Sequence, residues 1–246
     1  MTRPSAIVVG VGAEQGIGAA VCRRFAAEGY HVFVAGRTPA KIDQVVATIR
    51  AAGNSAEAVT TDVTVEADVI ALFDRAMADA ADHAPADVVV SNTGNNAIID
   101  FRELTADQFE DFWRVGCFGG FLVGREAARR LVPLGRGTMI FTGASGSLRG
   151  KPGFAHFAAA KAGLRMLSQS MAREYGPQGI HVAHVLIDGG VDGERVRKFV
   201  PALAEAKGEG GLLDVDAIAD TYWHLHCQHP SAWTQEIDLR PFRETY

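Results

Sequence analysis

The sequence predicts a doubly wound α/β domain, a parallel sheet of about seven strands with helices on both faces. Three observations lead to this prediction. Short β-branched apolar runs alternate with longer segments in which apolar residues recur every three or four positions. The 246 residues are 48% hydrophobic, which is enough for one buried core. No repeat or low-complexity linker divides the chain, so residues 1–246 are expected to form a single domain.

The strand and helix patterns follow one another in six strand-then-helix units. The first strand, Ala6 to Gly10, is β-branched and ends in glycines, and the helix after Gly18 stops at Gly29. The other expected strands are His31 to Ala35, Ala56 to Thr61, Asp87 to Ser91, Thr138 to Thr142, Ile180 to Leu186 and Glu236 to Leu239. The other expected helices are Pro39 to Ala52, Glu66 to about Asp82, about Asp107 to Leu131, about Phe154 to Tyr175 and about Val215 to Cys227. Ligands of such sheets bind at the carboxyl ends of the strands.

Composition excludes several classes of partner. The formal net charge is -5 and there is no basic tract, so no nucleic acid is expected to bind. The three cysteines are odd in number and widely spaced, which argues against a disulfide framework and favours a reducing compartment. No apolar run is long enough for a membrane helix, and the N-terminus lacks a signal-peptide layout. We therefore expect a cytoplasmic protein that acts on a small molecule.

The turn after the first strand reads G-V-G-A-E-Q-G-I-G and predicts a dinucleotide site. Gly12, Gly16 and Gly18 let the backbone approach a pyrophosphate, whose charge the N–H groups at the start of the helix stabilise. About twenty residues further on, where an acidic side chain would bind the adenosine ribose, the chain has Arg37. A guanidinium binds a 2′-phosphate in bidentate fashion, so NADP(H) is favoured. The alternative is that Arg37 is a solvated loop residue.

These motifs resemble those of the short-chain dehydrogenase/reductase family. The likeness covers almost the whole chain and rests on G-A-E-Q-G-I-G, T-D-V at residues 61–63, S-N-T-G at residues 91–94 and the helix that bears Lys161. It implies a single-domain Rossmann fold, a segment at residues 191–213 that closes over the substrate, and a homodimer or homotetramer. The cofactor-binding residues that it implies are Gly12, Gln15, Gly16, Ile17, Gly18, Arg37, Asp62, Val63, Asn92, Thr93, Gly94, Lys161, Ile187 and Gly189.

The catalytic positions depart from the family's pattern. The family uses a tyrosine as proton donor, a lysine four residues later, a serine thirteen residues before the tyrosine and an asparagine in the fourth helix. Lys161 matches the lysine, but the other three positions hold Phe157, Ala144 and Gly116. A phenyl ring has no O–H group and cannot donate a proton. The chain is therefore identified as a divergent member with an F-x-x-x-K motif.

Two other side chains are candidates for the missing proton chemistry. Ser145 follows Ala144, and its hydroxyl either reaches the substrate or bonds local backbone. Asp188 lies in I-D-G-G, where the family usually has a proline–glycine pair. It either donates a proton as a partly buried acid or only changes how the backbone holds the carboxamide. The segment His224 to His229 carries donor atoms for zinc, but a helix divides them between faces, so no metal site is expected.

Two functions fit this combination. The first is an NADP(H)-dependent oxidoreductase that transfers hydride to or from a small organic substrate, with C=N and C=C substrates favoured over simple ketones because they need no phenol. The second is a catalytically deficient NADP(H)-binding protein with a regulatory or structural role, in which Lys161 holds the ribose. Neither the substrate nor the reaction direction follows from the sequence.

Overall fold

A seven-stranded parallel sheet forms the centre of the molecule in the computed structural model, which describes residues 2–78 and 80–244. The strand order is β3-β2-β1-β4-β5-β6-β9, and every neighbouring pair runs parallel. The strands are β1 (Arg3–Val9), β2 (His31–Gly36), β3 (Ser55–Thr60), β4 (His83–Ser91), β5 (Gly137–Thr142), β6 (Ile180–Ile187) and β9 (Glu236–Leu239). The chain reverses its direction of winding between β1 and β4, which creates a ligand site at the strand ends in folds of this type.

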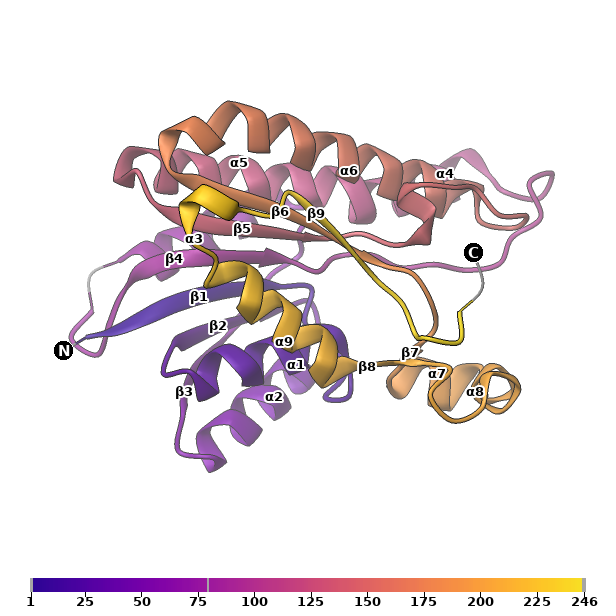
Figure 1. The fold of residues 1–246 in the computed structure, drawn as a ribbon, viewed down its shortest axis with the longest axis horizontal. Helices are drawn as coiled ribbons and strands as arrows, with labels where there is room; N and C mark the ends of the chain where they lie inside the picture. Colours follow the sequence, from indigo (N-terminus) through magenta and orange to yellow (C-terminus); the bar gives the residue numbers. More distant parts are fainter. Residues whose placement is uncertain (1, 79, 245–246) are drawn as a thin grey trace.

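Two layers of helices enclose the sheet, as Figure 1 shows with the sheet nearly edge-on. One layer contains α1 (Ile17–Ala27), α2 (Pro39–Ala51) and α9 (Val215–His226). The other contains α3 (Glu66–Met77), α4 (Ala106–Trp113), α5 (Gly119–Leu131) and α6 (Ala155–Tyr175). The predicted doubly wound architecture is confirmed.

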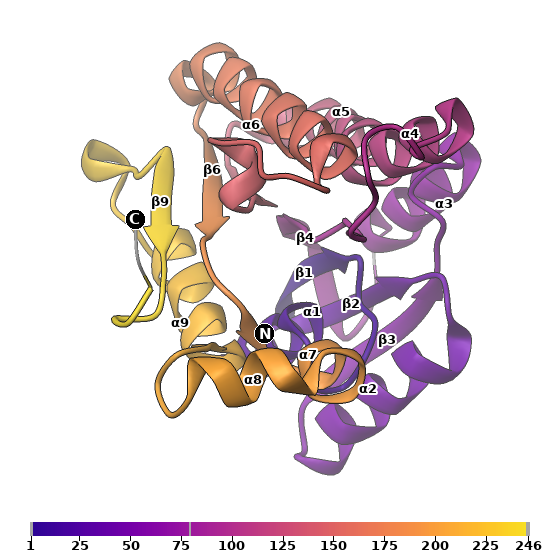
Figure 2. The ribbon, with the colours of Figure 1, turned by 90° about the vertical axis from the view of Figure 1, so that its right-hand side faces the viewer.

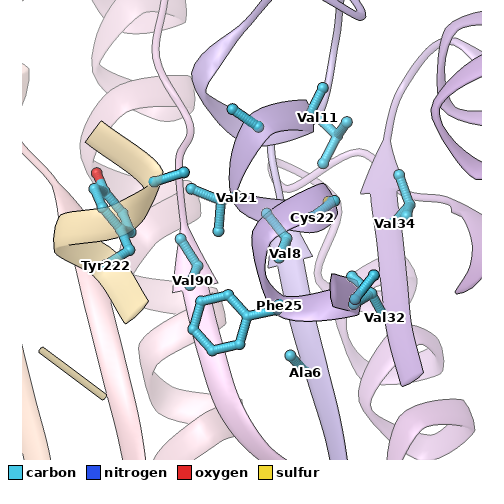
Figure 3. Close-up of a cluster of buried hydrophobic side chains, with 14 of the residues drawn as sticks. Ala6, Val8, Val11, Val21, Cys22, Phe25, Val32, Val34, Val90 and Tyr222 are labelled. Carbon is cyan, nitrogen blue, oxygen red and sulfur yellow. The ribbon is translucent and has the colours of Figure 1, made fainter. Parts of the chain in front are cut away.

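Each layer packs on the sheet through its own apolar cluster. Between α1 and the sheet, Phe25 is fully buried beside Val8 and Val90 (Figure 3). Its ring lies edge-on to Trp223 of α9, with 5.3 Å between the ring centroids. On the same helix the Tyr222 hydroxyl shares a 2.8 Å hydrogen bond with Thr142 at the end of β5. Burial of a phenylalanine such as Phe25 stabilises the fold by roughly 1.5–3 kcal/mol. Together with the hydrogen bond of Tyr222, this packing holds α9 firmly against the sheet.

The structure refines the predicted helix boundaries. The helix expected at about Asp107 to Leu131 is interrupted by one π-helical turn, Arg114–Phe118. Gly116 lies in this turn, and a Cβ placed there would be 2.9 Å from the Cβ of Ala160 on α6. The close approach of the two helices therefore requires a residue without a side chain at this point. The helix from Glu66 ends at Met77, earlier than expected, because Ala78 adopts an extended conformation.

Residues 191–213 contain regular structure that the sequence did not predict. Two short helices, α7 (Glu194–Phe199) and α8 (Pro201–Lys207), lie between the paired two-residue strands β7 (Val191–Asp192) and β8 (Leu213–Asp214). Figure 2 looks onto the carboxyl edge of the sheet and shows α7 and α8 beside that edge. Among the helices described, none combines the length and the apolar character needed to cross a bilayer.

Candidate functional site

The glycine-rich turn after β1 packs closely on the end of β4. Gly10 has φ +83°, and a Cβ there would be 2.5 Å from the backbone oxygen of Asn92. Gly18 is similarly close, because its Cβ would be 3.1 Å from the amide nitrogen of the Asn92 side chain. That amide donates a 3.3 Å hydrogen bond to the Gly10 carbonyl. Gly10 and Gly18 are thus needed for packing, and Asn92 holds the turn in place.

The middle of the same turn is open. A Cβ at Gly12 would meet no atom within 4 Å, so the backbone there is accessible to a ligand. Helix α1 begins at Ile17, and its N-cap, Gly16, has no side chain that could cap the first N–H groups. Gln15 precedes this N-cap, and its carbonyl accepts a hydrogen bond from the N–H of Glu194 in α7. An open turn and a helix start without a side-chain cap fit a pyrophosphate.

Asp62 and Arg37 lie close together, just after β3 and β2 respectively. The Asp62 carboxylate accepts hydrogen bonds from the N–H and the hydroxyl of Thr64, at 2.9 and 2.8 Å. Burial alone would raise the pKa of Asp62, but these hydrogen bonds, with Arg37 and Arg114, outweigh it and hold the pKa below its usual value. The Arg37 side chain is 59% exposed and 4.0 Å from the carboxylate. Its guanidinium is therefore free to turn toward a ligand.

Lys161 is buried at the centre of the site. Its Nζ donates to the backbone oxygens of Thr93 and Thr142, at 2.9 and 2.7 Å, and so joins the ends of β4 and β5. Gly94 makes room for it, because a Cβ there would be 3.0 Å from Nζ. Burial lowers the pKa of Lys161 to about 8. The amine is thus held rigidly and stays mostly protonated at neutral pH.

The three substituted positions carry no side chain that can form a hydrogen bond. Phe157 lies one helical turn before Lys161, and its ring packs beside Gly146, where a Cβ would be 3.0 Å from the ring. Ala144 is half-buried at the start of a 3₁₀ turn, residues 145–147. The position of Gly116 is closed by Ala160. None of these three residues has a side chain that can donate or accept a hydrogen bond.

The loop after β6 has an ion pair at its centre. The Asp188 carboxylate is buried, and both oxygens accept from Arg149, at 2.8 and 2.9 Å, with Arg240 at 3.3 Å. In this arrangement the carboxylate accepts hydrogen bonds and does not donate them. Ile187 packs in the apolar cluster beside α9, and Gly189 faces Pro241 of the C-terminal segment. This geometry supports a structural part for Asp188 rather than the proton donation considered above.

Helix α7 and the residue before it contact two segments at the carboxyl ends of the strands, the loop after β4 and the turn after β1. The Arg195 guanidinium donates to the carbonyl of Asn96, in the loop after β4. On the other side, Gly193 lies against the glycine-rich turn after β1, since a Cβ there would be 2.6 Å from the Gln15 oxygen. Arg197 forms a bidentate pair with Asp192 at 2.5 and 2.7 Å. These contacts place residues 191–197 next to the region around Gly12.

A profile of the short chain dehydrogenase family matches residues 6–201. The chain belongs to the short-chain dehydrogenase family. A crystal structure of a short-chain dehydrogenase from Rhodopseudomonas palustris is 39% identical, covers 97% of this chain and 99% of its own, and superposes with a TM-score of 0.81. The 3-oxoacyl-[acyl-carrier-protein] reductase MabA of Mycobacterium bovis is 31% identical over 85% of this chain and 77% of its own.

A gluconate 5-dehydrogenase from Burkholderia cenocepacia, solved with NADP and tartrate, shares the fold of this short-chain dehydrogenase. Its TM-score is 0.84 at 23% identity, with 98% of this chain and 95% of that chain covered. The names of MabA and of the gluconate 5-dehydrogenase give different substrates, so these comparisons leave the substrate of this chain open.

This short-chain dehydrogenase also contains a polar network that the sequence did not predict. Ser147 and His184 lie 3.5 Å apart from Oγ to Nε2, and His184 Nδ1 is 2.9 Å from the Glu236 carboxylate. Arg165 completes the network with two hydrogen bonds to Glu236, at 2.7 and 2.8 Å. Ser145, the candidate named from the sequence, is half-buried and begins the same 3₁₀ turn that contains Ser147. Alternation along β6 indicated which face His184 points to, but nothing in the sequence placed it near residue 147.

The charges around His184 determine its protonation state. Burial is the largest influence and lowers the pKa of His184 to about 4, although Glu236 acts in the opposite direction. Lys161 and Arg165 lower it further. The same guanidinium holds the pKa of Glu236 below its usual value, mainly through its hydrogen bonds. A neutral imidazole next to an ionised carboxylate carries its proton on Nδ1, which leaves Nε2 as an acceptor facing Ser147.

The histidines of the C-terminal helix have structural partners. His226 lies 2.7 Å from the Tyr30 hydroxyl and 3.0 Å from the Thr138 hydroxyl. His229 stands outside the helix and caps the short turn that follows it. Within residues 2–78 and 80–244 no three His, Cys, Asp or Glu side chains are grouped so that they could bind a metal ion. The three cysteines are free thiols.

Proposed function

We propose that this short-chain dehydrogenase is an NADP(H)-dependent oxidoreductase that transfers hydride to or from a small organic substrate. The observation that supports this most strongly is the joint geometry of the open turn at Gly12 and the buried Lys161. The turn is open, and the first N–H groups of α1 have no side-chain cap, which suits a pyrophosphate. Lys161 stands at the ends of β4 and β5, with its amine fixed toward the strand ends. When bound, NADP(H) supplies or accepts the hydride.

The choice of NADP(H) over NAD(H) rests on Arg37. Its guanidinium is exposed, and the only anionic group paired with it within the described residues is Asp62, at 4.0 Å. A dianionic 2′-phosphate would compete strongly for it through bidentate hydrogen bonds. We further propose that Asp62 and Val63 hold the adenine, and that Asn92, Thr93, Gly94, Ile187 and Gly189 border the nicotinamide half.

The side chains at the three substituted positions decide which substrates are suitable. Hydride transfer to a ketone leaves an alkoxide that needs a proton, and Phe157, Ala144 and Gly116 supply none. An iminium ion already carries its proton, and reduction of a conjugated double bond ends with protonation at carbon. The site is therefore best suited to C=N or C=C substrates. Loss of a general acid costs about 10²- to 10⁴-fold, so slower turnover of oxygen substrates is compatible with this proposal.

Residues 191–213 are proposed to close over the substrate within the single domain 1–246. The ties to Asn96 and Gln15 fix their N-terminal part beside the site. Two large apolar side chains at the carboxyl edge are exposed, Ile98 at 81% and Phe199 at 69%. Apolar side chains that border a site favour a substrate with an apolar portion.

The exposed face of α4 and α5 supports a homodimer or homotetramer. Phe109, Trp113 and Phe121 are each more than one-third exposed there, and the guanidinium of Arg125 covers one face of the Phe121 ring at 5.3 Å. Aromatic side chains of this kind are enriched in the buried centres of interfaces. The exposed free thiol of Cys227 fits a reducing, cytoplasmic location.

The alternative is a cofactor-binding protein without turnover. It is favoured by the absence of hydrogen-bonding side chains at Phe157, Ala144 and Gly116. One experiment separates the two functions. Binding of NADPH and NADH is measured by fluorescence, and NADPH oxidation is then followed with ketones, cyclic imines and enones. We expect tight NADPH binding, turnover of imines or enones, and weaker binding by Lys161→Met. Tight binding without any turnover would leave the alternative, and failure to bind either nucleotide would exclude both.

A further inference from the structure

The network of Ser147, His184 and Glu236 connects Ala144, at the family's serine position, to the molecular surface. The Ser147 hydroxyl accepts a 3.2 Å hydrogen bond from the N–H of Ala144, the residue that replaces the serine. His184 is completely buried behind it, while Glu236 is about one-quarter exposed at the edge of the sheet. A continuous row of polar groups thus leads from the strand end beside Lys161 to solvent.

The surrounding chain is built to admit this network. A Cβ at Gly143 would be 2.2 Å from His184 Nε2 and 3.0 Å from Ser147 Oγ. Any side chain at residue 143 would therefore displace the imidazole. The ring of Phe157 covers the other side of the same 3₁₀ turn through Gly146. A buried imidazole with a bonded carboxylate is costly to desolvate, so packing alone gives no reason for it at this place.

We propose that Ser147, His184 and Glu236 form a proton relay that serves the oxygen of an alcohol or carbonyl substrate in place of the absent tyrosine. This inference rests on the proposed oxidoreductase function and adds oxygen substrates to it. In alcohol oxidation, the substrate O–H proton passes to Ser147 Oγ as the hydroxyl proton of Ser147 passes to His184 Nε2. The carbinol C–H bond breaks, its hydride goes to NADP⁺, and the C=O bond forms.

The products balance this step. They are a carbonyl compound, NADPH and a protonated His184, whose charge the Glu236 carboxylate at 2.9 Å stabilises. The Nδ1 proton then passes through Glu236 to solvent, which leaves the Nε2–H tautomer of His184. The cycle closes when the imidazole exchanges this proton with solvent and returns to the Nδ1–H form that Glu236 stabilises, and reduction follows the same path in reverse. The charged groups around His184 are Glu236 on β9 with Lys161 and Arg165 on α6. The 3.5 Å separation of Ser147 and His184 is long, as catalytic hydrogen bonds often are without substrate.

The first test examines His184 without any turnover. Nitrogen-15 NMR of labelled histidine, in the nucleotide-free protein, reports the tautomer. We expect a proton on Nδ1 and a Nε2 resonance that shifts in Ser147→Ala, while the His181 signals stay in place. His181 is the matched residue, because it is buried on the same strand and stacks on Trp233 at 4.9 Å, away from Lys161. A proton on Nε2, or no change in Ser147→Ala, would overturn the relay.

The second test uses alcohol oxidation with NADP⁺. Ser147→Ala and His184→Gln should lower kcat by about 10²-fold or more, abolish the fall in rate on the acidic side of the pH profile, and leave NADP⁺ affinity unchanged. His181→Gln should change neither kcat nor the profile. If wild-type protein binds NADP⁺ and turns over imines or enones but no alcohol, the relay is refuted and the proposed function stands. If it binds no NADP⁺, the proposed function fails and the relay with it.

Discussion

Replacement of Phe157 by tyrosine tests how much of a standard catalytic site remains. The ring lies one turn before Lys161 on a single helix, so a hydroxyl added to it would enter the same side of the site as the amine. The amine is fixed by two carbonyl oxygens and is mostly protonated at neutral pH. Its charge lowers the pKa of a nearby phenol and so makes it a better acid. We expect Phe157→Tyr to reduce ketones that the wild type reduces poorly.

The expected gain in the rate of ketone reduction depends on the proton that the phenol would donate and on the donors that are still missing at residues 144 and 116. General acid catalysis contributes about 10²- to 10⁴-fold. Ala144 and Gly116 still provide no second donor for the substrate oxygen and no further proton path, so we expect about 10²-fold, which corresponds to roughly 3 kcal/mol of transition-state free energy. Because Phe157 is only half-buried, the new hydroxyl should reduce the free energy of unfolding by no more than about 1 kcal/mol.

The assay compares kcat/KM for ketones in wild type, Phe157→Tyr and the control Phe154→Tyr. Phe154 lies next to Phe157, with 6.4 Å between ring centroids, but just before the helix begins and not one turn from Lys161. It adds a phenol to the same region without the lysine partner. NADPH affinity, measured in parallel, should be equal in all three proteins. Equal ketone reduction by both tyrosine variants, or none by Phe157→Tyr despite tight NADPH binding, would show that the reasoning about this helix turn is wrong.

Three further predictions concern cofactor choice, pH and assembly. Arg37→Glu should weaken NADPH binding by about 10- to 100-fold, with NADH binding nearly unchanged in the same fluorescence titration; equal losses would contradict the 2′-phosphate assignment. His226 has its pKa lowered to about 4 by burial, so its contribution to stability is complete above pH 6.5 and is lost as pH falls toward 4. Urea unfolding at pH 7 and pH 5 should differ by about 2 kcal/mol more in wild type than in His226→Gln, and equal differences would refute this. Trp113→Glu should halve the mass seen by light scattering, whereas an unchanged mass would place the interface elsewhere.

The order of strands and helices could be predicted from the sequence because it depends on local patterns. Apolar periodicity, the glycines after β1 and short connections are properties of neighbouring residues. The π-helical turn at residues 114–118 depends instead on the contact of Gly116 with Ala160, which is far away in the chain. The short helices within residues 191–213 likewise depend on partners such as Gln15 and Asn96. Neither set of partners is visible in a local pattern.

The same distinction between local and long-range contacts applies to the residues of the candidate site. Lys161 and the replacement of the family's tyrosine by Phe157 could be found by spacing alone, because residues four apart lie on one face of a helix. The ion pair of Asp188 with Arg149 could not, since the two residues meet only when the loops after β5 and β6 fold together. Ser147 is a small residue in a serine- and glycine-rich loop, and its approach to His184 depends on the register of β5 against β6.

Close packing at one of the three substituted positions limits what single substitutions can restore. A side chain at residue 116 would meet the Cβ of Ala160 at 2.9 Å, so the asparagine of the family's pattern does not fit there unless the helices move. A standard set of donors therefore cannot be rebuilt one residue at a time around the present backbone. Phe157 is not blocked in this way, because its ring already occupies the position from which a hydroxyl would act. Phe157→Tyr should accordingly tolerate His184→Gln, since a phenol beside Lys161 needs no relay. If instead the double variant loses ketone reduction, the relay supplies the proton even when a tyrosine is present.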